Sequence, residues 1–307
     1  MIKKVNVNDI EEILGFKLCE YSVKQIDDLN LEYQYTDKSE RDEIILDIIK
    51  KISNNDMERA GDHRLNRWES GWHENLISYK SEGKYKNLIP RYFGKYDVAR
   101  WKGDFVKVNK AFDYNLHIVI VDAIFHKFIT NEYTHIYEFG CGPAYNLYRM
   151  WSYNKLINMV GLDWANISQE IINVIKEKNK NIKISGENFN FMHPNYKLDI
   201  EESSVVFTHS ALEQIGESHK DFIDFVLCKK PALCINFEPA PELLNRDCLM
   251  EELTFLYQKK RNYLRNYFSY LFELEKNNKI KIIYHKKINC GSRYMQHQSI
   301  IVWKPIA

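Results

Sequence analysis

Apolar and polar positions follow two alternating patterns over residues 112–307, and together they predict an α/β fold. Short apolar runs of strand length are separated by longer segments whose apolar side chains recur every three or four residues, the spacing of helices. The predicted strands are residues 135–139, 157–162, 182–185, 203–208 and 232–237. The predicted helices between them are residues 112–130, 146–153 and 167–180. This order is typical of a parallel sheet with helices on both faces.

The last part of the sequence departs from the alternation. A helical stretch over residues 248–276 is followed by two β-rich runs, residues 279–285 and 298–303. Two neighbouring strands in this place indicate a mostly parallel sheet into which the last strand inserts antiparallel. We therefore predict a Rossmann-like sheet of seven strands with an antiparallel last strand. The usual dehydrogenase layout, with parallel strands throughout, is disfavoured.

Residues 1–111 differ from the rest in their pattern of polar and apolar residues. They are predicted to form a helical accessory or lid region ahead of a sheet domain over residues 112–307. Amphipathic spacing predicts short helices at residues 7–14, 23–29 and 41–52. From Arg67 onward the sequence becomes dense in Trp, Tyr, Arg and His. These side chains either pack a surface loop or line a substrate wall, because aromatic faces stack on sugars or bases and arginines bind anions. The candidate substrate contacts are Trp68, Trp72, Arg91 and Tyr92.

Residues 134–164 carry the strongest chemical signal, reading as strand, glycine turn, helix, strand and acid. Gly140 and Gly142 follow the first strand at once. Without a Cβ, they let backbone amides approach a ligand and tolerate a positive φ. Asp163 ends the next strand, about twenty residues after the glycines, where a carboxylate can accept ribose hydroxyls. The layout is that of a nucleotide-binding βαβ unit; the alternative is a turn with no ligand.

Glu138, directly before the glycines, distinguishes between cofactors. A dinucleotide places its pyrophosphate at the helix amino end and commonly has a third glycine there, whereas this sequence has Tyr145. Glu138 would put a negative charge beside that pyrophosphate. The same carboxylate suits the cationic amino-acid end of S-adenosylmethionine. Charge complementarity therefore favours S-adenosylmethionine over NAD.

Further candidates follow the later strands, at the sheet edge where ligands bind. Asn188 or Asn190 could bond the adenine amine, or they are turn residues. His209 can accept a hydroxyl proton at neutral pH. If a helical turn begins at His209, Glu213 lies on the same face and could orient it or bind substrate.

Glu238 follows the fifth strand and is expected at the same edge as His209. Together with a neighbouring carboxylate it could bind sugar hydroxyls, assist proton removal or hold a divalent metal, and the sequence does not choose among these. Arg261 and Arg265 lie four residues apart within the predicted helix. They could meet an anionic substrate or form a solvated basic face.

Composition limits the classes of partner. The formal net charge is +1 and the pI is near 7.6, which gives no electrostatic reason to expect nucleic acid. No apolar run approaches the roughly twenty residues needed to cross a bilayer, and the amino terminus lacks an apolar secretory segment. The 6 cysteines show no CxxC pair or His/Cys ligand cluster, so no metal site is predicted. A cytoplasmic protein with a small-molecule acceptor is expected.

The sequence resembles the class I S-adenosylmethionine-dependent methyltransferases in YEFGCG, GLDW and VVFTHSALEQIG. In WESGWHENL, LIPRYF, KPALCINFEPAPEL and IVWKP it resembles the sugar O-methyltransferases of bacterial surface-polysaccharide gene clusters. The resemblance implies a Rossmann-like catalytic domain, methyl transfer to a hydroxyl of a sugar, nucleotide-sugar or glycan, and cofactor contacts at Glu138, Gly140, Gly142 and Asp163. One departure is Asn190, where an Asp is expected; an amide oxygen can still accept from the adenine amine.

Three alternatives remain from the sequence. An N-methyltransferase for a small amine would use the same cofactor residues but need little help from a base. A nucleotide-sugar dehydrogenase would bind NAD instead. A non-catalytic binding or scaffold protein would bind no S-adenosylmethionine at all.

Overall fold

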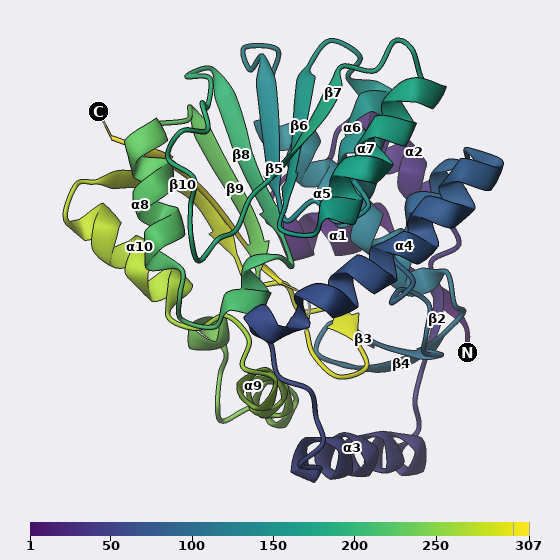
Figure 1. Cartoon of the computed structure of the whole chain (residues 1–307). Coiled ribbons are helices and arrows are strands. Elements are labelled where there is room, and N and C mark those ends of the chain that lie inside the picture. Colours follow the sequence, from purple (N-terminus) through teal and green to yellow (C-terminus); the bar gives the residue numbers. More distant parts are fainter. Residues whose placement is uncertain (297, 307) are drawn as a thin grey trace.

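A seven-stranded sheet forms the centre of the molecule (Figure 1). This computed structural model describes residues 1–296 and 298–306. The strand order is β10-β12-β9-β8-β5-β6-β7. The strands are β5 (His135–Phe139), β6 (Asn158–Asp163), β7 (Ile184–Asn188), β8 (Ser204–His209), β9 (Leu233–Glu238), β10 (Ile280–Lys286) and β12 (Ser299–Pro305). Strands β5 to β9 pair in parallel, and β12 is antiparallel to both of its neighbours. The prediction of a seven-stranded, mostly parallel sheet is confirmed.

Helices cover both faces of this sheet, because side chains alternate between the faces along each strand. On one face, Ile136 of β5 packs in a core with α5 (Phe112–Phe128), α6 (Tyr145–Tyr153) and α7 (Asn166–Lys178). On the other, Tyr137 packs with α8 (Lys220–Lys229) and α10 (Tyr267–Lys276). The in-register pairing of β5 with β6 and β8 brings the ends of these three strands to one edge. The glycine turn, Asp163 and His209 meet there.

The amino-terminal region contains the expected helices and also a sheet that the sequence did not predict. Helices α1 (Val7–Leu14), α2 (Glu20–Asp28) and α3 (Lys38–Ser53) lie where amphipathic spacing placed them. The second sheet has the order β1-β2-β4-β3-β11. Its strands are β1 (Lys3–Lys4), β2 (Glu32–Tyr35), β3 (Val98–Trp101), β4 (Asp104–Val108) and β11 (Gly291–Ser292). Strands this short give almost no periodic signal.

Of the two alternatives for the aromatic segment after Arg67, the surface loop does not hold for its first part: residues 67–82 belong to α4 (Leu65–Glu82), which crosses one edge of the main sheet (Figure 1). One helix prediction is corrected. The helical stretch over residues 248–276 is two helices, because Asn262 and Asn266 take the left-handed conformation between α9 (Leu249–Arg261) and α10. Arg261 and Arg265 therefore do not share a helix face.

Single-turn 3-10 helices connect several of these elements: η1 (Asp62–Arg64), η2 (Tyr85–Leu88), η3 (Leu212–Ile215) and η4 (Pro241–Leu243). Across residues 1–296 and 298–306, none of the helices combines the length and the apolar character needed to cross a membrane.

Candidate active site

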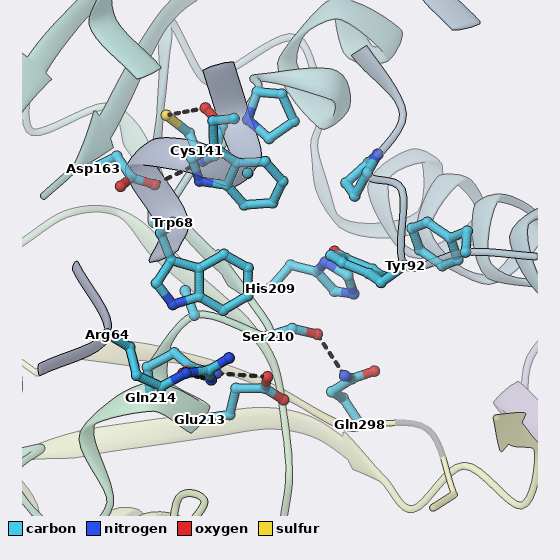
Figure 2. A pocket seen from close by; sticks show the side chains of 18 of the residues that line it. Arg64, Trp68, Tyr92, Cys141, Asp163, His209, Ser210, Glu213, Gln214 and Gln298 are labelled. Carbon is cyan, nitrogen blue, oxygen red and sulfur yellow. Dashed lines mark hydrogen bonds between the residues drawn. The ribbon is translucent and has the colours of Figure 1, made fainter. Parts of the chain in front are cut away.

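A cavity of about 490 Å³ lies where the carboxyl ends of β5, β6 and β8 meet α4 (Figure 2). It brings together most of the residues singled out from the sequence. The predicted cofactor residues that line it are Glu138, Gly140, Gly142, Asp163 and Asn190. The other predicted residues that line it are Trp68, Trp72, Arg91, Tyr92, His209, Glu213 and Arg261. Asn188 and Glu238 are not among its lining residues.

The glycine turn is closely covered on two sides. Gly140 and Gly142 both have positive φ, +73° and +51°. A Cβ on Gly140 would overlap the Cβ of Ala211, and one on Gly142 would lie 3.0 Å from the ring of Trp72. The turn therefore requires glycine for its backbone conformation and for the approach of its neighbours.

Asp163 fastens the end of β6 to the glycine turn. Its Oδ2 accepts a hydrogen bond from the amide of Gly142 at 2.8 Å, and its Oδ1 accepts one from the amide of Ala165 at 2.9 Å. Burial raises the pKa of Asp163 to about 6. Since a carboxylate can accept about four hydrogen bonds, Asp163 can take further donors from a ligand.

Glu138 is a buried carboxyl group of which only one oxygen has a hydrogen-bond partner among the described residues. Its Oε1 accepts from the side-chain amide of Asn146 at 2.7 Å, while Oε2 has no hydrogen-bond partner within the described part of the chain. Burial raises the pKa of Glu138 to about 8, and the charge of Asp163 adds to this. A buried acceptor without a donor is costly, so this oxygen calls for a donor or a cation from a ligand.

His209 is held at the cavity wall by Tyr145. The hydroxyl oxygen of Tyr145 lies 3.2 Å from Nδ1 of His209 and 3.2 Å from Nε2 of His117. The centroids of the two imidazole rings lie 4.5 Å apart. Sequence reasoning missed both partners. His117 sits in the apolar helix α5, where nothing in the sequence pattern marks it, and Tyr145 was considered only as a replacement for glycine.

The acids near His209 divide into two roles. Glu213 lines the cavity and accepts from the side-chain amide of Gln214 at 2.9 Å; burial raises its pKa to about 7. The expected helical turn from His209 does not form, because Ser210 has a φ of +52° and η3 begins only at Leu212. Glu213 is therefore not brought beside the imidazole by helical spacing.

Glu238 lies beneath the loop instead of at the cavity wall, which corrects its predicted place. Its side chain is fully buried and accepts hydrogen bonds from the amides of Ala211 at 3.1 Å and Glu213 at 3.2 Å. Burial raises the pKa of Glu238 to about 8. Its carboxyl group thus holds the segment that carries Glu213.

The two candidate asparagines also separate. Asn188 donates to the carbonyl of Trp164 at 2.9 Å and to the side chain of Asn166 at 3.0 Å, outside the cavity. This position corrects its predicted contact with adenine. Asn190 lines the cavity between Phe189 and Phe191, which line it too.

Helix α4 forms the aromatic wall. The rings of Trp68 and Trp72 stack with centroids 5.3 Å apart. Between them in sequence, Glu69 accepts from the amides of Asn166 at 2.7 Å and Ile167 at 3.1 Å, at the amino end of α7. A carboxylate there is favoured by the free amides and the helix dipole. Glu69 thus fastens α4 across the sheet edge.

Tyr92 and Arg91 complete the wall from the segment after η2. Both are partly exposed, and Arg91 forms an ion pair with Glu74 of α4 at 2.7 Å. The cavity is also lined by Arg64 and Arg67, which precede or begin α4 and were not among the predicted residues.

No protein-family model matches the sequence, and no curated protein does. Among solved structures, the small RNA methyltransferase HEN1 is 15% identical over 62% of this chain and 25% of its own, with a TM-score of 0.45. The O-methyltransferase NcsB1 from neocarzinostatin biosynthesis is 11% identical over 78% and 70%, with a TM-score of 0.43. The 16S rRNA methylase ArmA is 15% identical over 76% and 98%, with a TM-score of 0.45. The chain thus spans only a quarter of HEN1, and these likenesses are too distant to assign an activity.

Proposed function

We propose that this chain is an S-adenosylmethionine-dependent O-methyltransferase that acts on a hydroxyl of a sugar or sugar-like acceptor in surface-polysaccharide biosynthesis. The observation that carries the proposal is the unpartnered Oε2 of Glu138 in the cavity wall, directly before the glycine turn. An ammonium group satisfies a buried carboxyl oxygen, whereas a pyrophosphate would repel it. The site therefore fits S-adenosylmethionine better than NAD.

The other lining residues fit the same cofactor. Asp163 retains acceptor capacity for the ribose hydroxyls, and Asn190 lies between two phenylalanines that offer an apolar surface to adenine. Gly140 and Gly142 leave room for close backbone approach. When bound, the cofactor supplies a methyl group on a sulfonium, which is already a reactive electrophile.

The acceptor side belongs to the residues around His209. In this proposal His209 takes the acceptor's hydroxyl proton at Nε2, the ring nitrogen that Tyr145 does not contact, while Tyr145 holds the ring through Nδ1. Glu213 lines the same cavity and positions acceptor hydroxyls. The stacked rings of Trp68 and Trp72 exclude water and offer flat faces to a sugar. This aromatic wall and the resemblance of the sequence support a sugar acceptor.

Calorimetric titration with S-adenosylmethionine, S-adenosylhomocysteine and NAD tests the cofactor assignment. The first two are expected to bind, and Asp163→Ala is expected to abolish that binding. Asp199→Ala, which removes a fully exposed carboxylate, is the matched control and should bind as the unmodified protein does. Binding of NAD alone, or of none of the three, would overturn the proposal.

The acceptor step is tested by transfer of a labelled methyl group from S-adenosylmethionine to glycan acceptors. His209→Ala is expected to lower turnover by about 10²-fold to 10⁴-fold, the usual contribution of a general base. Binding of S-adenosylhomocysteine should be unchanged. Full turnover by His209→Ala would exclude His209 as the general base and favour an amine acceptor.

A further inference from the structure

We propose that the acceptor carries an anionic group, a carboxylate or a phosphate, which is bound by Arg64 and Arg261. The inference deepens the proposed function, on which it rests for the role of the ligand. Figure 2 shows Arg64 and Glu213 on one side of Trp68 and Asp163 on the other. The cavity therefore extends beyond the cofactor residues, and its far end is lined by arginines.

Arg64 is a buried cation with incomplete partners. Only 4% of it is exposed. Its Nη1 donates to the side chain of Gln214 at 2.7 Å, its Nη2 lies 3.4 Å from a carboxylate oxygen of Glu58, and its Nε has no partner in the part of the chain that the structure describes. Burying a guanidinium without full pairing is unfavourable, so this position favours an added anion.

Glu58 is too weak a counter-ion to neutralise this end of the cavity. It is shared, because Arg67 contacts the same oxygen at 2.9 Å, and it is partly exposed to solvent. Solvent and salt screen such a pair. Glu58 is thus the shared counter-ion of Arg64 and Arg67, and Arg261 adds a further positive charge.

Arg261 adds a third positive charge from the end of α9. Its Nε donates to the hydroxyl of Tyr263 at 3.3 Å, and it lines the same cavity as Arg64. Burial lowers the pKa of Arg64, and the charge of Arg261 lowers it further, which places the two guanidinium groups in each other's field. Glu213 is the carboxyl group that lies in the field of both guanidinium groups, and burial raises its pKa to about 7, which weakens it as their counter-ion.

The chemistry of the ligand follows from this surplus of positive charge. Guanidinium forks bind carboxylate and phosphate oxygens in pairs, more strongly than they bind neutral hydroxyls. Trp68 lies against Arg64, with the guanidinium 5.0 Å from the ring centroid, and offers a flat apolar face beside the charge. A sugar ring on that face with an acidic substituent, such as a uronic acid or a sugar phosphate, satisfies both features.

The test is calorimetry on the protein saturated with S-adenosylhomocysteine. The probes are methyl β-glucuronide, glucose 1-phosphate and the neutral methyl β-glucoside. At least one anionic probe is expected to bind about tenfold more tightly than the glucoside, and which one binds identifies the source of the charge. Arg261→Gln is expected to weaken that binding about tenfold, and Arg64→Gln likewise. Lys259→Gln, an exposed charge two residues earlier on α9, is the matched control and should have no effect.

Three outcomes overturn the inference: equal binding of neutral and anionic probes, binding of none, or anionic binding that Arg261→Gln leaves intact. Arg261 is less buried than Arg64, so its variant decides the question if Arg64→Gln does not fold. The two proposals fail separately. A protein that does not bind S-adenosylhomocysteine but binds an anionic probe through Arg261 would refute the methyltransferase and retain the anion site.

Discussion

The hydroxyl oxygen of Tyr145 lies 3.2 Å from Nδ1 of His209 and at the same distance from Nε2 of His117. One hydroxyl has one proton to donate, so at most one of the two nitrogens accepts from it. A second bond at the same oxygen requires an N–H from the other ring. Tyr145 thereby couples the tautomers of the two histidines.

Replacing Tyr145 by Phe is expected to uncouple these rings without altering the fold, because the phenyl group keeps the packing. The ¹⁵N signals of both imidazoles should shift, because each ring loses the hydroxyl that it shares with the other. Long-range ¹H–¹⁵N NMR spectra recorded across pH 5 to 9, where histidine titrates, measure this. Tyr153→Phe removes a hydroxyl from the same helix and should leave both rings unchanged. Identical spectra for the two variants would contradict the coupling.

Cofactor binding is expected to release a proton through Glu138. In the free protein burial raises the pKa of Glu138 to about 8, so the group is mostly protonated at pH 7. A cationic amino group beside it favours the charged form and lowers that pKa. The complex then holds fewer protons than the free protein, so affinity should rise with pH until about pH 8. Above that pH the ligand's own amino group loses its proton, so affinity should fall.

Titration of S-adenosylhomocysteine at pH 7 in two buffers of different ionisation heat measures the released proton. The apparent binding enthalpy should differ between the buffers for the unmodified protein and become nearly equal for Glu138→Gln. Proton uptake, or an unchanged release in the variant, would contradict the role of Glu138.

Gly140→Ala is expected to destabilise the fold and abolish cofactor binding. The substitution forces a side chain into a φ of +73° and against Ala211. Strain and overpacking together should lower the free energy of unfolding by roughly 2 to 4 kcal/mol, measured in urea. Gly71→Ala is the control: it lies within α4 with nothing within 4 Å of the added Cβ. That variant should instead gain about 0.5 to 1 kcal/mol.

Glu69→Ala is expected to loosen α4 over the cavity. The change leaves two amides at the start of α7 without their acceptor and should cost about 1 kcal/mol. Hydrogen exchange should rise in α4 and in the first turn of α7, and should remain unchanged in β5. Glu177→Gln, an exposed acid near the other end of α7, should leave the exchange of α4 unaltered. Equal protection of α4 in both variants would contradict this role.

Sequence reasoning succeeded where the signal is local. Ile136 and Tyr137 alternate between the two faces of the sheet, and Gly140 and Asp163 belong to one strand–turn–strand unit. Such patterns depend on neighbours in sequence. The edge at which β5, β6 and β8 end follows from the parallel order.

The residues that were missed or misplaced depend on packing between distant segments. His117 reaches the cavity only because α5 lies against β8, and Arg64 only because α4 crosses the sheet edge. Glu238 ends a strand at the expected edge, yet its side chain turns to the amides of Ala211 and Glu213. The spacing of apolar residues along the chain does not predict which groups a buried carboxyl group will accept hydrogen bonds from.

Strand β11 ties the carboxyl-terminal part of the chain to the amino-terminal sheet, so the chain does not divide cleanly between the two. It comes from the connection between β10 and β12, yet Gly291 pairs with Arg100 and Ser292 with Ala99 in the amino-terminal sheet. Arg100, fully buried, also donates to the carbonyls of Met250 and Tyr294. A protein that begins after residue 111 would therefore lack β3, which pairs with β11, and Arg100, which holds the carbonyls of Met250 and Tyr294. Recombination of this accessory region with another catalytic sheet would have to transfer the β10–β12 connection as well.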